Sequence, residues 1–273
     1  MTLALAQGLQ LRGRRPAILA YRIGPGDGSS ADPIEVFPDS DWRATSEEAV
    51  LLRRESGIRV FVTRNRARAW ERLAGGAVGG EPFDTLVSDD GYQDPRLPGA
   101  VHIALMAPGE RPGLFDLLPG GPFRETVSAA ARADLILTGP ASVTDTLPGP
   151  GFTRPMMLPD GWDAPCIVHC ALGNNQPFLE ELRRAGVRIL ETVPGRNHGP
   201  APLGRLKAAA ARHPGAAILC TRKEGLKLAG VAGLPPVLVI DRETRLDAAA
   251  WQALEARLQL LPRNRYLVHY PRC

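Results

Sequence analysis

Short apolar runs alternate along this chain with longer segments in which apolar residues recur every three or four positions. The short runs are typical of buried β-strands, and the periodic segments are typical of amphipathic helices. The alternation predicts an α/β fold in which crossover helices join the strands of a mostly parallel sheet. We expect strands at residues 16–20, 60–63, 85–88, 101–106, 135–138, 166–170, 188–191, 217–220 and 236–240. We expect helices at residues 47–55, 66–74, 124–131, 175–185, 202–211, 223–228 and 247–258.

A stretch rich in proline and glycine, residues 139–165, divides these elements into two series. Proline and glycine mark turns and loops, so this stretch is the best candidate for a linker. With 273 residues the chain can bury a large core and form two lobes. We place an N-terminal lobe at residues 1–148 and a smaller C-terminal α/β lobe at residues 149–273.

Two carboxylates, Asp89 and Asp90, close an apolar run at residues 83–88 and are followed by Gly91. In an open α/β sheet the ligand binds at the carboxyl ends of the strands. A carboxylate pair at that place suits Mg²⁺ and a triphosphate, because Mg²⁺ takes one or two carboxylates together with phosphate oxygens and water. The alternative is ordinary turn chemistry, in which Asp begins a loop and Gly supplies a positive φ.

A second segment, residues 117–125, reads Leu-Leu-Pro-Gly-Gly-Pro-Phe-Arg-Glu. Together with residues 89–97 it resembles the signature of the tetraacyldisaccharide 4′-kinases, the lipid A 4′-kinases. That family typically shows Asp-Asp-Gly-(Phe or Leu)-Gln-His and then Leu-Leu-Pro-Ala-Gly-Pro-Leu-Arg-Glu. Weaker similarities extend the resemblance over nearly the whole chain, at residues 14–19, 59–66, 171–182 and 221–228.

The resemblance implies a P-loop-NTPase-like fold, a doubly wound and mostly parallel sheet with a smaller C-terminal α/β lobe. Residues 1–148 would then be the nucleotide-binding lobe. It also implies a phosphotransferase that uses ATP and Mg²⁺ to phosphorylate the 4′-hydroxyl of tetraacyldisaccharide 1-phosphate, a glycolipid precursor of lipid A. The alternative is a noncatalytic relative that binds glycolipid or a partner protein without phosphoryl transfer.

The two matched segments supply most of the candidate site residues. Asp89 and Asp90 would hold or orient Mg²⁺, and Gln93 would organise the loop that follows them. Arg124 and Glu125 would complete the site around nucleotide and acceptor, although Arg124 could equally make a structural ion pair.

Two further catalytic candidates lie where the chain departs from the family pattern. Glu47 aligns with an Asp that is thought to activate the substrate hydroxyl, and Glu can serve as a general base. Glu47 could instead belong to the cap of a helix that begins after Thr45 or Ser46. His198 aligns with a Pro-Asp-His-His stretch whose His partners the base, but a loop histidine beside Gly and Pro can also simply be solvated.

The largest departure from the family is at the beginning of the sequence. The family carries Gly-x-x-x-x-Gly-Lys-Thr ahead of its first helix, where backbone N–H groups cradle the phosphates. This sequence contains no such motif, and residues 3–13 match the body of the helix that should follow it. We expect the natural protein to start further upstream and to include the loop and the first strand. A degenerate homologue that has lost them is the alternative.

The net charge of +4 is spread over arginine-rich segments such as residues 53–54 and 64–72. A basic face suits an anionic membrane surface and a phosphorylated glycolipid, although a solvated helix face is the simpler interpretation. No zinc spacing, aromatic-rich sheet or recognition-helix pattern favours nucleic acid. The sequence lacks an apolar run of about 18 residues and a secretory-type N-terminus. Without such segments we expect the cytoplasmic side, and the resemblance implies peripheral contact with the inner membrane. We expect a monomer.

Cysteine usage favours a structural role. Cys166 and Cys170 occupy alternate positions of one expected strand, which places both on the same face as Val168. Structural zinc needs a second ligand pair, and none is nearby in the sequence. We expect these two cysteines and Cys220 to be reduced core residues.

Overall fold

The computed structural model describes the chain except for residues 23–32, 76–77, 95–96, 98–99, 109–111, 122, 142–148, 159–161, 198, 261–264 and 270–273. The chain forms two compact units, Met1–Pro155 with Glu243–Cys273 and Met156–Arg242. Residues 243–273, which the sequence analysis assigned to the C-terminal lobe, thus belong to the first unit.

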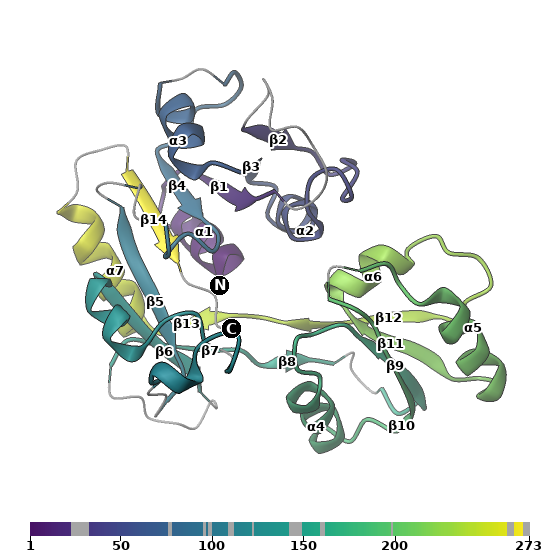
Figure 1. Ribbon diagram of the computed structural model, residues 1–273. Helices are drawn as coiled ribbons and strands as arrows, with labels where there is room; N and C mark the ends of the chain where they lie inside the picture. Colours follow the sequence, from purple (N-terminus) through teal and green to yellow (C-terminus); the bar gives the residue numbers. More distant parts are fainter. Residues whose placement is uncertain are drawn as a thin grey trace. The chain divides into compact units, whose positions relative to one another are not determined.

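A sheet with the strand order β13-β7-β6-β5-β14-β4-β1-β3-β2 is the basis of the first unit (Figure 1). Among the described residues, only the pairings of β2 with β3 and of β13 with β7 are antiparallel. The order of strands in the sheet differs from their order in the chain, as crossover connections require. The strands are β1 Pro16–Tyr21, β2 Ile34–Val36, β3 Arg59–Thr63, β4 Thr85–Ser88, β5 Val101–Met106, β6 Leu135–Ala141, β7 Gly151–Thr153, β13 Arg245–Leu246 and β14 Arg265–His269.

The side chains on each face of this sheet pack against helices. α3, Arg66–Ala74, contributes Ala69 and Leu73 to a core with Leu19, Phe61 and Leu86 of the strands. Asn65 caps α3, since its side-chain oxygen accepts a hydrogen bond from Arg68 N at 3.1 Å. The other helices of this unit are α1 Thr2–Leu11, α2 Glu47–Ser56 and α7 Ala248–Gln259.

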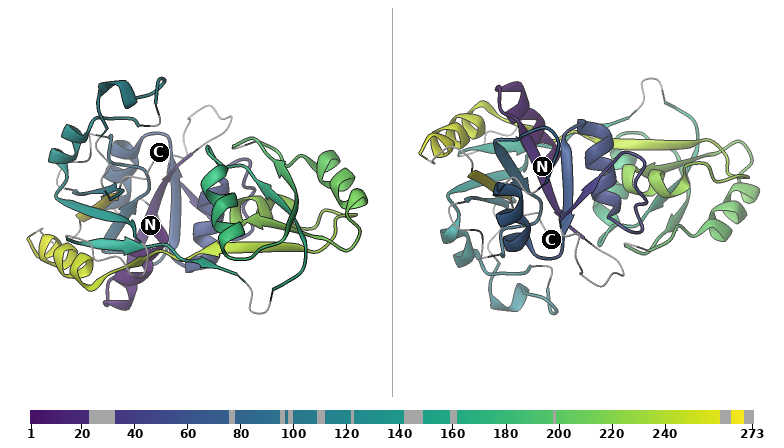
Figure 2. Two further views of the ribbon diagram at one scale, coloured as in Figure 1. Left: turned by 90° about the horizontal axis from the view of Figure 1, so that it is seen from below. Right: turned by 90° about the horizontal axis from the view of Figure 1, so that it is seen from above.

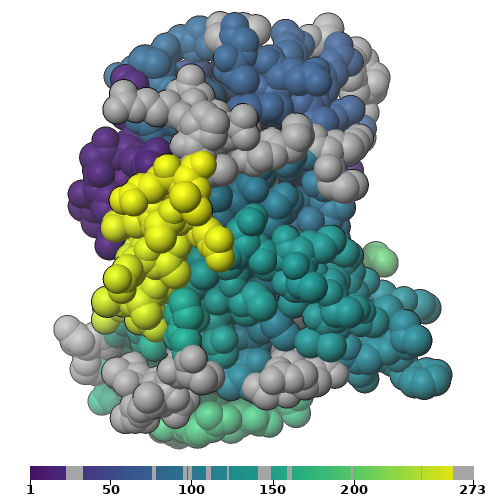
Figure 3. All heavy atoms as spheres, turned by 90° about the vertical axis from the view of Figure 1, so that its left-hand side faces the viewer, coloured from purple at the N-terminus to yellow at the C-terminus, as the bar shows by residue number. Residues whose placement is uncertain are grey.

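α1 contacts β1, β4 and α2, and α7 contacts β6 and β7. α1 and α7 lie side by side in Figures 2 and 3, the first purple and the second yellow. Gly8 of α1 faces the indole ring of Trp251 of α7 so closely that a Cβ at Gly8 would lie 2.1 Å from the ring. The absence of a side chain at Gly8 therefore lets these two helices approach.

The second unit is a smaller sheet with helices on both faces, in the strand order β10-β9-β11-β12-β8. α4 packs on the face that carries Cys166, Val168 and Cys170, and α5 and α6 pack on the face of Ile167. Its strands are β8 Met156–Met157, β9 Cys166–Cys170, β10 Ile189–Pro194, β11 Ala217–Thr221 and β12 Val237–Arg242. Its helices are α4 Gln176–Arg184, α5 Leu203–Arg212 and α6 Arg222–Leu228.

The cysteine prediction is confirmed. Cys166 and Cys170 lie on one face with Val168, and these two cysteines and Cys220 are free thiols in the core. Burial raises the pKa of Cys220 to about 12, so this thiol stays protonated at neutral pH.

The helix predicted at residues 124–131 is wrong. The segment instead contains a short 3₁₀ helix, Val127–Arg132. Val127 N donates to Pro112 O at 2.9 Å, and the Tyr92 hydroxyl donates to Ala129 O at 2.7 Å. Peptide groups that an α-helix would use are thus bonded to other parts of the unit, and the long-range contacts override the local helical pattern.

Candidate active site at the carboxyl end of β4

Asp89 and Asp90 follow directly after the last residue of β4. Asp89 N donates to Leu19 O at 2.8 Å, so the chain is still paired with β1 at this point. The neighbouring parallel strands β1 and β3 end at the same edge of the sheet. The two carboxylates therefore stand where an open α/β sheet binds its ligand.

Asp89 is held by contacts from two helices. Thr2 Oγ1 of α1 donates to Asp89 Oδ1 at 2.6 Å, and Arg66 Nη2 of α3 donates to the Asp89 carbonyl oxygen at 2.8 Å. Burial lowers the pKa of Arg66, against the opposing effect of the carboxylates of Asp90, Asp89 and Asp94. A partly buried cation thus lies close to three acidic side chains at this edge of the sheet.

Asp90 has a left-handed backbone conformation, with φ 52°. Its carboxylate accepts two hydrogen bonds from Arg124 Nη1, at 2.8 and 3.1 Å. The turn interpretation of Asp-Asp-Gly is thus confirmed in part, but the residue with positive φ is Asp90 and not Gly91. Such backbone is uncommon for a side chain other than glycine and occurs often at functional sites.

The ion pair between Asp90 and Arg124 joins the two sequence segments that carry the resemblance. The side chains of Asp90 and Arg124 are partly exposed, at 31 % and 41 % respectively. The structural ion pair that the sequence analysis considered for Arg124 is therefore present. Its partner is Asp90, so Arg124 lies next to the two carboxylates. Glu125, the next residue, pairs with Arg132 at 2.7 and 2.8 Å.

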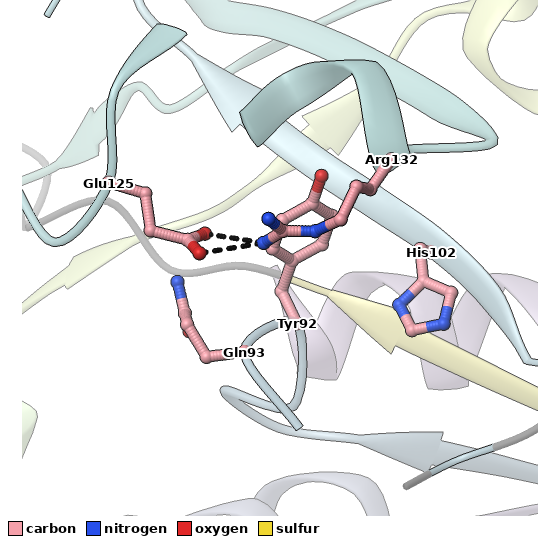
Figure 4. Close-up of a pocket in the computed structure, with 5 residues that line it drawn as sticks. All are labelled: Tyr92, Gln93, His102, Glu125 and Arg132. Carbon is pink, nitrogen blue, oxygen red and sulfur yellow. Dashed lines mark hydrogen bonds and ion pairs between the residues drawn. The ribbon is translucent and has the colours of Figure 1, made fainter. Parts of the chain in front are cut away.

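A cavity of about 350 Å³ lies beside this ion pair in the first unit, lined by Tyr92, Gln93, His102, Glu125 and Arg132 (Figure 4). The amide nitrogen and oxygen of Gln93 are both buried and have no hydrogen-bond partner among the described residues. The Gln93 amide points toward the Glu125 carboxylate in Figure 4. Buried amide groups normally have hydrogen-bond partners, so this amide has unused donor and acceptor capacity at the cavity.

The opposite wall of the cavity consists of aromatic rings. The rings of Tyr92 and His102 meet edge to face with centroids 5.9 Å apart, and Arg132 lies over the Tyr92 ring. Burial lowers the pKa of His102 and raises the pKa of Tyr92. Both rings are therefore neutral at neutral pH, and the charges of the cavity reside on Glu125 and Arg132.

Glu47 is the first residue of α2 and is buried, with 6 % of its surface exposed. α2 leads into β3, which runs parallel to β1, so the N-terminus of α2 lies toward the carboxyl ends of these strands. Ser46 occupies the N-cap position but its side chain makes no capping hydrogen bond. The helix thus begins after Ser46, as the cap interpretation expects, but without the capping hydrogen bond, and Glu47 is buried at its first position.

His198, the proposed partner of Glu47, lies outside the described residues. The residues on either side of it belong to the second unit. Gly199 O accepts a hydrogen bond at 2.9 Å from Lys227 Nζ, and Val193 O contacts His169 Nδ1 at 2.8 Å.

Sequence reasoning missed the buried charged cluster to which these two contacts belong. His169 Nε2 lies 3.1 Å from Glu224 Oε2, and Lys227 Nζ lies 3.1 Å from Glu224 Oε1. The side chains of all three residues are at most 3 % exposed. The cluster connects the centre of the second sheet to α6 and to both ends of the segment 193–199.

Among the described residues, no group of three or more His, Cys, Asp or Glu side chains forms a complete metal site. Mg²⁺ does not need one, because it binds to one or two carboxylates plus phosphate oxygens and water. The oxygen donors of Asp89 and Asp90 fit that pattern, and they are the residues that would hold the ion.

Comparison with known proteins finds a family and relatives that match most of the chain. A family profile described as tetraacyldisaccharide-1-P 4′-kinase (LpxK) matches residues 1–259. A tetraacyldisaccharide 4′-kinase of Alkalilimnicola ehrlichii is 31% identical over 269 residues, which are 94% of this chain and 77% of that protein. The corresponding protein of Parvibaculum lavamentivorans is 28% identical over 95% of this chain and 74% of its own.

A solved structure shows the same fold. The crystal structure of "apo" form LpxK from Aquifex aeolicus in complex with ATP superposes with a TM-score of 0.63 at 20% sequence identity. The match covers 94% of this chain and 83% of that one. The P-loop-kinase-type α/β fold expected from the sequence is thereby confirmed.

Proposed function

Because the chain belongs to the tetraacyldisaccharide 4′-kinase family, we propose that it transfers the γ-phosphoryl group of ATP to the 4′-hydroxyl of a tetraacyldisaccharide 1-phosphate. The observation that carries the proposal within the structure is the Asp89–Asp90 pair at the carboxyl end of β4. Its tie to Arg124 brings both family segments to one place.

The carboxylates would act by position and charge. Asp89 and Asp90 would hold Mg²⁺, which when bound neutralises phosphate charge and orients the transferred group. Thr2 and Arg66 fix Asp89, and Arg124 fixes Asp90, so both carboxylates are oriented before a ligand arrives. Preorganised charge of this kind supplies most of the rate enhancement in phosphoryl transfer.

Glu47 would take the proton from the acceptor hydroxyl. Its place at the N-terminus of α2, on the same edge of the sheet as the carboxylate pair, supports this role. His198 remains its proposed partner from the sequence pattern.

The acceptor would contact the cavity beside Asp90. Gln93 offers two donor hydrogens and one acceptor oxygen, which suit the hydroxyl and amide groups of an acylated amino sugar. Glu125 would present its carboxylate to the same ligand while Arg132 holds it in place.

The acceptor in this family is a lipid, and we place the protein peripherally at the cytoplasmic face of the inner membrane, as a monomer. The arginine-rich helices support contact with an anionic surface. None of the helices in the described part of the chain combines the length and the hydropathy that crossing a bilayer requires.

The Asp89→Asn variant tests the proposed function. Asparagine keeps the oxygen that accepts from Thr2 but removes the charge that Mg²⁺ requires, so we expect kcat to fall about a hundredfold or more. The measurement is phosphate transfer from ATP to a detergent-dispersed acceptor.

A matched control lies at the opposite end of the same strand. Asp84 precedes β4, accepts hydrogen bonds from Arg15 N and is partly exposed. Asp84→Asn should leave kcat within about twofold, since it lies far from the carboxyl edge and surface pairs contribute little. Equal activity of the Asp89→Asn variant and the wild type would reject the metal assignment.

A further inference from the structure

The loop between β5 and the 3₁₀ helix Val127–Arg132 exposes three large apolar side chains. Leu114, Phe115 and Leu118 are 76 %, 97 % and 60 % exposed. Other exposed apolar side chains in the described part of the chain, such as Leu11 and Leu260, are separated along the sequence. Scattered apolar residues are normal on a protein surface, whereas a group within five positions indicates an interaction site. We call residues 113–118 the apolar tip.

The apolar tip is folded, so its exposure is not the result of a loose chain. Asp116 Oδ2 accepts from Gly113 N at 2.8 Å, and Asp116 O accepts from Phe123 N at 3.0 Å. Leu118 N donates to Phe123 O at 2.7 Å. A Cβ at Gly121 would lie 2.2 Å from Asp116 O, so the two sides of the loop are in close contact. These contacts hold the three apolar side chains outward.

The segment projects from the surface of its unit, as the blue-teal residues at the top of the left view in Figure 2 and at the lower right in Figure 3 show. Asp116 is the one charged residue in the apolar tip, and its carboxylate is engaged with Gly113. Entry of the tip into an apolar medium would therefore remove few charges from water.

The same loop continues into the candidate site. Leu117 pairs with Phe123 in a short bridge, and the next residue, Arg124, holds Asp90. The apolar tip is thus connected to the carboxylate pair through the segment that ends in Arg124. An acceptor with long acyl chains, as the proposed function requires, would reach this site from a lipid layer.

We propose that the apolar tip inserts Leu114, Phe115 and Leu118 among the acyl chains of a lipid bilayer and so docks the first unit on the membrane that carries the acceptor. The proposal rests on the proposed function. Leucine and phenylalanine side chains favour this environment, and a bilayer needs no complementary surface. Three side chains form too small a patch for a stable protein partner, since such interfaces bury about 800 Å² on each side.

The double variant Leu114→Asp/Phe115→Asp tests the proposal in a vesicle flotation assay. The vesicles consist of equal parts of phosphatidylcholine and phosphatidylglycerol. We expect the partition of the variant onto vesicles to fall at least about tenfold relative to the wild type. Both positions are exposed, so the variant should melt at the temperature of the wild type.

Leu11→Asp is the matched control, because Leu11 is 87 % exposed at the end of α1, outside the apolar tip. It should partition as the wild type does. Equal vesicle binding by the double variant and the wild type would overturn the proposal, as would an equal loss in the Leu11→Asp control. A concentration-dependent dimer that the double variant abolishes, without vesicle binding by the wild type, would assign the tip to self-association and also overturn it.

A transfer assay with detergent-dispersed acceptor separates this proposal from the proposed function. The double variant should retain wild-type turnover in detergent and lose it selectively when the acceptor is embedded in vesicles. Absence of turnover in the wild type under both conditions would reject the kinase activity whatever the flotation result.

Discussion

At the scale of single residues, the candidate site and the core of the second unit contain hydrogen bonds between polar side chains that are distant in the sequence. Asp90 and Arg124 are 34 positions apart, and His169 and Glu224 are 55 apart. The contact between Asp90 and Arg124 is partly exposed, whereas Glu224 is buried, and a buried charge is stable only when it is paired and hydrogen-bonded. Both contacts join chain segments that are distant in the sequence.

Glu224 gives a prediction about stability and pH. Burial alone would raise the pKa of Glu224, but hydrogen bonds from His169 and Lys227 outweigh burial and hold the pKa below the ordinary value of 4.5. A lowered pKa means that the ionised group stabilises the folded state above the ordinary pKa, and that this contribution is lost as the pH falls through the lower pKa of the folded state. Glu224→Gln should cost about 3 kcal/mol at neutral pH, because it leaves Lys227 buried without a charged partner.

Urea denaturation of the wild type and the variant at neutral and acidic pH measures this difference. The difference in the free energy of unfolding should shrink below pH 4.5. Glu243→Gln is the control, since Glu243 also has a lowered pKa from Arg245 but is half exposed, and it should change stability by less than about 1 kcal/mol. A difference for Glu224→Gln that stays constant down to strongly acidic pH would contradict the assignment.

The place of Asp89 and Asp90 directly after β4 was predictable, because an apolar run marks the strand that they follow. The sequence could not pair Arg124 with Asp90, since that contact depends on the fold of the intervening loop. The His169–Glu224–Lys227 cluster was unpredictable for the same reason. His169 reads as one residue of an apolar strand, and the other two read as the polar residues of a short helix.

At the scale of elements, the strands buried on both faces were predictable as continuous apolar runs. The prediction of residues 166–170 agrees with β9, and that of residues 85–88 agrees with β4. β7, β8 and β13 have only two or three residues and fall below the length at which a pattern can be read. β14 was missed as well, although it takes a central place between β4 and β5. Its position comes from pairing with distant strands, which local pattern does not contain.

The contact between α1 and α7 gives a prediction at this scale. Alanine normally stabilises a helix relative to glycine by up to about 1 kcal/mol. Gly8→Ala should instead lower the melting temperature, because its Cβ would overlap the Trp251 ring, and overpacking costs about 1–3 kcal/mol.

Gly204→Ala provides the comparison. Gly204 lies within α5 and has open space around it, so alanine should raise stability there by about 0.5–1 kcal/mol. Differential scanning calorimetry of the two variants measures both effects. A rise in melting temperature for Gly8→Ala equal to that for Gly204→Ala would show that α1 and α7 do not approach as described.

At the scale of the whole molecule, the first unit is discontinuous in the sequence. The chain leaves it after Pro155, forms the second unit and returns at Glu243. The domain boundary predicted from the proline- and glycine-rich stretch divides the chain at one place. It could not show that the last residues of the chain belong to the first unit. The α/β class and the kinase family were nevertheless accessible from the sequence, because periodicity and two short motifs survive at about 30% identity.

Identification of the reaction product is the most direct test of the central claim. The purified protein is incubated with ATP, Mg²⁺ and detergent-dispersed tetraacyldisaccharide 1-phosphate, and the lipid is analysed by mass spectrometry. Our account predicts the addition of one phosphate at the 4′ position, lost when Mg²⁺ is chelated and strongly reduced in the Asp89→Asn variant. An acceptor that is recovered unchanged with the folded wild-type protein would contradict it.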